Sequence, residues 1–106
     1  MKSMKKKFWT MTEVMEIYEV DETFMLDLER EEILWPVRRR GSSARLYSDR
    51  DLESLRLAKI LVEEMGVNLE GVEIILRMRE SMFQMRSQFD DILEDLARQL
   101  RDRIHE

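Results

Sequence analysis

Charged side chains of opposite sign gather in two neighbouring stretches of this 106-residue chain. Residues 11–35 hold nine Asp and Glu residues and a single base, Arg30, whereas residues 36–48 hold four arginines and no acid. Carboxylates at this density can steer a basic partner and raise its association rate, and arginines can hold phosphate groups. Electrostatic binding is therefore the chemistry that these residue types favour. The candidate sets are Glu13, Glu16, Glu19, Asp21, Glu22 and Asp27 for a basic partner, and Arg38, Arg39, Arg40 and Arg45 for phosphates.

Ordinary structural roles would explain the same residues. An acidic helix face is often only solvated, and the arginines could pair within the chain, with the acidic segment or with Asp49 and Asp51. Affinity for nucleic acid depends largely on neutralising phosphates with Lys and Arg, so a duplex would repel a recognition helix inside the acidic segment. The sequence favours a protein partner for the acids and leaves DNA binding by the arginines as the alternative.

Residues suited to catalysis or metal binding are scarce. The chain has no cysteine and one histidine, His105, so neither a thiol nucleophile nor the common Cys and His metal sites can be assembled. It also lacks a G-x-S-x-G motif and a phosphate-binding loop. We therefore expect a protein that is not an enzyme, with no catalytic residues, no metal and no cofactor.

The composition is typical of a helix-rich domain with many solvated faces, since 43% of the residues are hydrophobic and 39% are charged. Apolar runs stay well below the roughly 18 to 20 residues that cross a bilayer, so no membrane contact is expected. Lysines precede Phe8 and Trp9, but no apolar signal-peptide core follows them. Together with the absence of cysteine, this favours a cytoplasmic location.

Two short helices are expected in the acidic segment. Thr10 stands three residues before Glu13, which is a capping-box pattern for a helix over 12–18. Asp21 is a suitable N-cap for a second helix over 22–31. Two short helices joined by a tight turn form a helix-turn-helix unit.

A β-hairpin that runs into a third helix is expected over 37–52. Gly-Ser-Ser at 41–43 has the composition of a turn, and residues 45–47 read as the return strand. Ser48 and Asp51 form a second capping-box pattern, which places an acid in the first turn of the next helix. A hairpin after a helix pair indicates a winged helix-turn-helix.

A short strand or arm is expected over 5–9, and Trp9 and Trp35 are expected to anchor the hairpin from beneath. The predicted fold class is thus mainly α, a winged helix-turn-helix with a small β-hairpin wing and a long C-terminal helix. We expect two parts, a winged domain over 1–79 and a C-terminal helix over 80–106.

The C-terminal half is predicted to be helical almost throughout. A helix over 49–65 should stop at Gly66, and Asn68 should cap the next helix. The residues of that helix expected in the core are Leu69, Val72, Ile75, Leu76 and Met78. The last helix is expected over about 81–104, where it can continue directly from the one before.

Apolar residues along this last helix recur at spacings of three and four, which is a coiled-coil-like seam. A seam of this kind must be covered, either by folding back onto the domain or by a second copy, and we favour an antiparallel or crossed homodimer. The residues of the seam are Met82, Met85, Phe89, Leu93, Leu96 and Leu100.

Residues 45–52, with their Arg-x-Tyr element, and residues 66–72, with Asn-Leu-x-Gly-Val, resemble the MerR-type winged-helix superfamily. The resemblance covers about residues 11–78 and is closest to two branches. One contains the CbpM-type chaperone modulators, which bind and restrain the J-domain of a DnaJ-like or CbpA-like co-chaperone. The other contains the HspR-type heat-shock repressors, which are dimeric DNA-binding transcription regulators. The resemblance implies a winged helix in both cases.

One departure from the superfamily pattern separates these branches. DNA-binding members carry an arginine in the second helix that meets the DNA, and Asp27 stands near that position here. J-domains have a strongly basic second helix, which suits an acidic partner surface. The resemblance therefore implies a chaperone modulator, and an HspR-like regulator is the alternative. Met11 and Leu26 are candidate apolar anchors for the partner, because they fall off the apolar stripes of the two helices.

Overall fold

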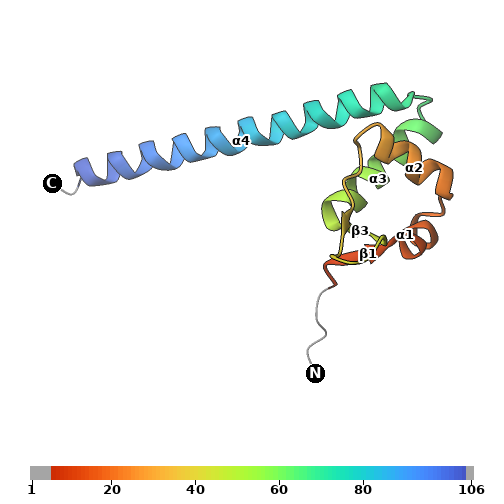
Figure 1. Ribbon diagram of the computed structural model, residues 1–106. Helices are drawn as coiled ribbons and strands as arrows, with labels where there is room; N and C mark the ends of the chain where they lie inside the picture. Colours follow the sequence, from red (N-terminus) through yellow and green to blue (C-terminus); the bar gives the residue numbers. More distant parts are fainter. Residues whose placement is uncertain (1–5, 105–106) are drawn as a thin grey trace. The chain divides into compact units, whose positions relative to one another are not determined.

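The computed structural model describes residues 6–104, so that Lys5 and His105 lie outside the described part of the chain. Figure 1 shows short helices beside a small sheet, followed by one long helix. The elements follow in the order β1 (Phe8–Thr10), α1 (Met11–Tyr18), α2 (Glu22–Arg30), β2 (Val37–Arg38), β3 (Arg45–Ser48), α3 (Asp49–Glu63) and α4 (Leu69–Ile104). The predicted mainly-α winged helix with a long C-terminal helix is confirmed.

The helices begin where their capping residues predict. Thr10 and Ser48 complete capping boxes at the starts of α1 and α3, and the backbone N–H of Phe24 donates to Asp21 Oδ1 over 2.8 Å at the start of α2. Asn68 caps α4 in the same way, because its Oδ1 accepts from the Gly71 N–H over 2.8 Å. Each bond satisfies an amide that the first turn of a helix would leave unpaired.

Three strands, rather than two, make the wing sheet. The order is β1-β3-β2 and both pairings are antiparallel. Trp9 pairs with Tyr47 across β1 and β3, and Tyr47 is fully buried. Trp9 is half-buried, but Trp35 is 67% exposed, so its predicted anchoring role is wrong. Its backbone rather than its ring is held, since the Trp35 N–H donates to Asp51 Oδ1.

The core lies between the helix pair, the inner face of the sheet, α3 and the first turn of α4. Because each helix presents one apolar stripe, one to three residues from each helix close it, together with one residue of β3 and two of the loop after α2. Its members are Val14, Met25, Leu28, Ile33, Leu34, Tyr47, Leu52, Leu55, Ala58 and Val72.

Contacts divide the chain into two units, residues 1–74 and 75–106. Helix α4 is continuous through the point where one helix was expected to follow another. Val72 is buried as predicted, but Ile75 is 39% exposed and Met78 is 59% exposed, so their predicted core positions are wrong. Met78 lies in the second unit and belongs to the exposed apolar stripe of α4.

Candidate partner-binding surface

Four of the six predicted acidic residues are exposed in the helix-turn-helix unit. Glu16 lies on α1, Glu19 ends it, and Asp21 and Glu22 open α2. They fall within seven consecutive residues that contain no base. The turn between the two helices therefore carries a dense negative charge, which can act on a partner over about a Debye length, roughly 8 Å at physiological salt.

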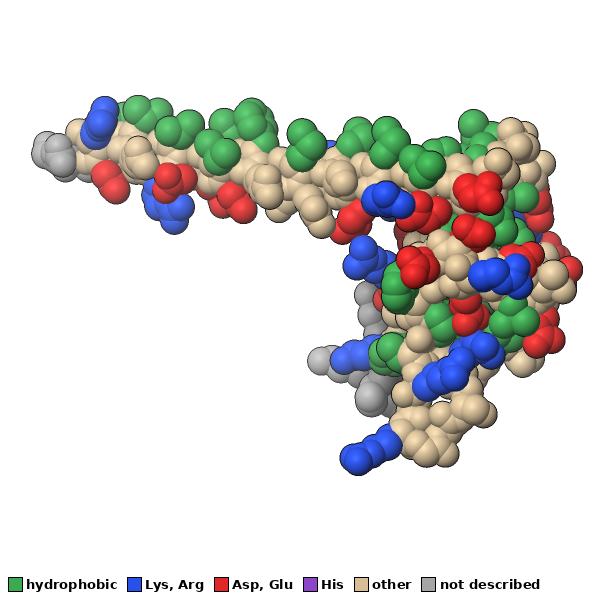
Figure 2. All heavy atoms as spheres, turned by 45° about the horizontal axis from the view of Figure 1, so that its top comes forward, with side chains coloured by type: hydrophobic (Ala, Val, Ile, Leu, Met, Phe, Trp, Pro, Cys, Tyr) green, Lys and Arg blue, Asp and Glu red, His purple; other side chains and the backbone are tan. Residues whose placement is uncertain are grey.

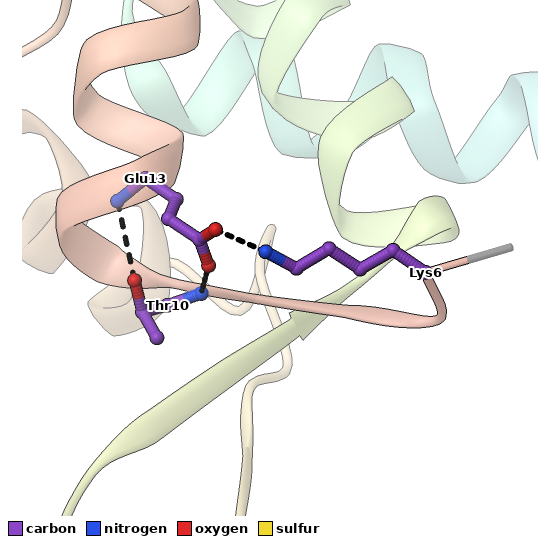
Figure 3. Close-up of polar contacts among 3 residues, drawn as sticks. All are labelled: Lys6, Thr10 and Glu13. Atoms are coloured by element: carbon purple, nitrogen blue, oxygen red, sulfur yellow. Dashed lines mark hydrogen bonds and ion pairs between the residues drawn. The ribbon is translucent and has the colours of Figure 1, made fainter. Parts of the chain in front are cut away.

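Glu13, the first residue of the acidic set, has local partners. Its carboxylate forms an ion pair with Lys6 and accepts from the Thr10 backbone N–H over 2.9 Å, and Figure 3 shows both contacts. The Lys6 hydrogen bond is the main cause that lowers the pKa of Glu13, and the Thr10 N–H adds to it. Glu13 thus stabilises the start of α1 and is half-buried.

Asp21 and Asp27 also serve the fold. Asp21 caps α2 through the Phe24 N–H, and Asp27 pairs with Arg30 one turn later, with 3.0 Å between Oδ1 and Nη1. Arg30 is the only base of the acidic segment, and this contact holds it beside an acid. Glu16, Glu19 and Glu22 are therefore the residues best placed to offer charge to a partner.

Two glutamates adopt a left-handed backbone that favours glycine. Glu19 has φ 53° at the C-cap of α1, and Glu32 has φ 59° just after α2. A side chain with a Cβ costs roughly 1–2 kcal/mol in this region. Both residues are exposed, so each strained position presents a carboxylate to the solvent.

Apolar side chains accompany the acids. Ile17, which the sequence reasoning missed, is 56% exposed directly after Glu16. It falls off the buried stripe of α1, and an apolar residue on the polar side of a short helix was the signal available in the sequence. Met11 and Leu26, the predicted anchors, are half-buried, so Ile17 offers more apolar surface than either.

A polar cluster joins α2 to the wing. Glu29 accepts from Arg45 Nε over 2.8 Å and from the Tyr47 hydroxyl over 2.9 Å, and its side chain is only 16% exposed. Burial raises the pKa of Tyr47, and the hydrogen bond to Glu29 raises it further, so the hydroxyl keeps its proton and remains the donor. Arg45, a predicted phosphate contact, thus has an internal partner.

The other wing arginines lie at a turn. Arg38 ends β2, and Arg38, Arg39 and Arg40 are all exposed. Gly41 follows with φ 80°, and the Ser42 N–H donates to the Arg39 carbonyl over 3.0 Å. The tip of the wing is therefore a basic surface of this unit.

The exposed part of α4 carries the predicted seam. Figure 2 shows hydrophobic side chains in a row along one side of α4, with charged side chains mostly on the other. The exposed fractions are 68% for Met82, 68% for Met85, 60% for Phe89, 48% for Leu93, 50% for Leu96 and 59% for Leu100. An exposed apolar row of this kind is suited to contact with another helix.

Residues 6–104 were also compared with the requirements of a metal site and of a membrane-spanning helix. There is no group of three His, Cys, Asp or Glu side chains that could hold a metal ion. No helix in this part of the chain is long and apolar enough to cross a membrane. The candidate binding surfaces are the acidic turn, the wing tip and the α4 seam.

Comparison with known proteins agrees with this architecture. The family described as MerR HTH family regulatory protein matches residues 9–94, a range that covers the helix-turn-helix, the wing and most of α4. A search of curated proteins finds no match. Because the match spans most of the chain, the protein is a member of the MerR helix-turn-helix family of regulatory proteins.

Proposed function

We propose that the protein is a chaperone modulator whose acidic surface docks on the basic helix of a J-domain in a DnaJ-like co-chaperone. The docked surface covers that helix and keeps it from its chaperone. The observation that carries the proposal is the exposure of Glu16, Glu19 and Glu22 around the α1–α2 turn. A cationic helix would be steered toward this surface and oriented by it.

The distribution of bases in the same unit supports a protein partner over DNA. Arg30 pairs with Asp27, and Arg45 pairs with Glu29. A helix that binds a DNA duplex needs its cationic side chains to face the phosphates. In α2 the one cation instead lies beside an acid, so this helix is poorly suited to a polyanion.

Apolar contacts supply most of the binding energy in this proposal, since exposed ion pairs contribute only about 0–1 kcal/mol each. Ile17 is the first candidate because it is exposed within the acidic surface. Met11 and Leu26 are half-buried and can add contact area at its edge. The charges then set the association rate, and the apolar side chains set the lifetime of the complex.

Charge reversal tests the proposal. The variant with Glu16→Lys, Glu19→Lys and Glu22→Lys leaves Asp21 as the cap of α2, and the matched control reverses Asp91, Glu94 and Asp95 on α4. Association with a purified J-domain is followed by stopped-flow fluorescence across a salt series. At low salt we expect at least about a tenfold slower association for the first variant only. Equal rates for the two variants and the natural protein would contradict the proposal.

A DNA-binding regulator is the second candidate, favoured by the exposed arginines at the wing tip. In this case Arg38, Arg39 and Arg40 hold phosphates, and paired α4 helices set the spacing of the half-sites. A mobility-shift series on random duplex DNA distinguishes the two candidates. A steep salt dependence that the triple change Arg38→Ala, Arg39→Ala, Arg40→Ala removes would support DNA binding.

In both candidates we propose that a second copy of the chain covers the α4 seam. The seam runs from Met82 to Leu100 and leaves about half or more of each side chain exposed. Burial of apolar surface contributes roughly 25 cal/mol per Å², so a pair of such helices gains stability that a single helix lacks. Sedimentation across a concentration series tests the dimer.

A further inference from the structure

We propose that Met78, Met82 and Met85 form an oxidation site on α4, and that their conversion to methionine sulfoxide disrupts the contact that covers the seam. This inference rests on the self-association proposed above and adds to it a modification site and the consequence of the modification. It involves no residue of the acidic surface, so the J-domain proposal is independent of it.

Exposure separates these three methionines from most of the others. Within residues 6–104, Met25 is fully buried, and Met11 and Met15 are half-buried. In a single chain, a dissolved oxidant therefore reaches the methionines of α4 more readily than those of the core. Their exposed fractions are 59% for Met78, 68% for Met82 and 68% for Met85.

The three methionines lie on one face of α4. They follow one another at intervals of four and then three residues, and this spacing places side chains in one row along a helix. They make up the first part of the apolar row that Figure 2 shows. Three leucines make up its last part, so the seam has a thioether half and an aliphatic half. The leucines are Leu93, Leu96 and Leu100.

The choice of methionine for one half of the seam has a chemical consequence. Branched aliphatic side chains are the usual residues of a helix seam, and methionine, which is unbranched and flexible, specifies packing less well. The property that the thioether has and leucine lacks is its reaction with oxidants. The first half of the seam thus combines an apolar contact surface with a group that can be made polar.

Hydrogen peroxide is the simplest oxidant for this reaction. A lone pair of the methionine sulfur attacks one peroxide oxygen, an S–O bond forms and the O–O bond breaks. The departing hydroxide takes up the remaining proton and leaves as water. Sulfur loses two electrons and the peroxide gains them, so the products are one sulfoxide and one water for each peroxide consumed.

The sulfoxide oxygen is a strong hydrogen-bond acceptor on a side chain that was apolar. If the seam is covered, this oxygen loses its water, and the side chains of Phe89, Leu93 and Leu96 have no hydrogen-bond donor to replace it. We therefore expect oxidation to weaken self-association by at least about tenfold, which corresponds to one unpaired polar group in the contact.

The same contact shields the sulfur atoms. Oxidation should therefore be slower in paired chains than in separate chains, and oxidised chains should stay apart. Met65 provides a comparison within the protein, because it is 65% exposed but lies in the first unit, between α3 and α4. Its oxidation should leave self-association unchanged.

Sedimentation across a concentration series, before and after treatment with dilute hydrogen peroxide, tests the inference. Peptide mass spectrometry identifies the oxidised methionines. The variant with Met78→Leu, Met82→Leu and Met85→Leu keeps the volume and the apolar character of the seam, so it should self-associate but not respond to peroxide. Met65→Leu is the matched control and should respond as the natural protein does.

A second variant imitates the oxidised state without an oxidant. Met78→Gln, Met82→Gln and Met85→Gln place an amide group where each sulfoxide would lie, and glutamine is as good a helix former as methionine. This variant should self-associate at least about tenfold more weakly than the natural protein.

Three results would overturn the inference. One is self-association that persists unchanged after the three methionines are oxidised, and another is an equal response to peroxide in the triple leucine variant. The third is a natural protein that is monomeric before oxidation, which would overturn the proposed self-association as well. Association with a J-domain is measured separately, so none of these results decides the J-domain proposal.

Discussion

Helices α3 and α4 both carry an apolar row, yet only one row is buried. In α3, Leu55 and Ala58 have no exposed surface, whereas Leu96 in α4 is 50% exposed. Both rows recur at helical spacing, so periodicity identifies the apolar face of each helix but does not say what covers it. In the first unit the sheet and the helix pair supply the cover, and for α4 we propose a second chain.

The largest effect is expected when one leucine of each row, Leu55 in α3 and Leu96 in α4, is replaced by alanine. Leu55→Ala should lower the free energy of unfolding by about 2–5 kcal/mol, because it leaves a cavity in the core. Leu96→Ala should change the unfolding of the monomer by no more than about 0.5 kcal/mol and should weaken self-association instead. Chemical denaturation and sedimentation of both variants provide the measurements. Similar losses of unfolding free energy would show that α4 is covered within its own chain.

The next comparison sets a buried acid against an exposed one. Glu29→Ala removes the acceptor of both Arg45 and the Tyr47 hydroxyl, so the free energy of unfolding should fall by about 1–3 kcal/mol. Glu16→Ala, on the exposed side of α1, should stay within about 0.5 kcal/mol. Thermal unfolding followed by circular dichroism compares them. If Glu29→Ala were neutral, the contact between α2 and the wing would not contribute to stability.

A smaller effect with the opposite sign is expected at Glu19. Its positive φ is favourable only for glycine, so Glu19→Gly should raise the free energy of unfolding by about 0.5–1 kcal/mol. Glu16→Gly, in the interior of α1, should lower it by about 1 kcal/mol. The same Glu19→Gly protein should associate more slowly with a J-domain. A variant that is more stable and binds equally fast would show that the charge of Glu19 has no role in binding.

The smallest effect is a pH dependence at the start of α1. Lys6 and the Thr10 N–H lower the pKa of Glu13 in the folded protein. The Glu13 carboxylate therefore stabilises the fold at pH values above the pKa that Glu13 has in the unfolded chain. This contribution is lost as the pH falls through the folded-state pKa. The difference in stability between the natural protein and Glu13→Gln should therefore shrink in acid. In a Lys6→Met background, the stability difference caused by Glu13→Gln should be smaller. A stability difference that does not change with pH would contradict the stabilising role of the Glu13 carboxylate.

Local features of the fold could be predicted from the sequence because local contacts determine them. Thr10, Asp21, Ser48 and Asn68 all cap the helices that they were expected to cap. Each capping bond joins residues only three positions apart, so the residue types alone carry the information. The wing hairpin was predictable for the same reason, because Gly41 supplies the positive φ of its turn.

Features that depend on distant contacts were harder to predict. Trp35 and Met78 were assigned to the core as large apolar residues, but their neighbours in space leave them exposed. The internal pairing of Arg45 with Glu29 joins residues sixteen positions apart, and the sequence offered it only as one of several possibilities. The acidic set was visible in composition, but composition did not separate acids that pair within the chain, such as Asp27 with Arg30, from exposed acids such as Glu22.

The most direct test of the account compares two ligands on one protein. The affinities of the natural protein for a J-domain and for random duplex DNA are measured in one low-salt buffer, before and after reversal of Glu16, Glu19 and Glu22 to lysine. Reversal of these three charges should weaken the binding of the J-domain and strengthen the binding of DNA. A J-domain affinity that does not change on reversal would contradict the proposed docking surface. Tight binding of DNA by the natural protein that the reversed variant loses would contradict it as well.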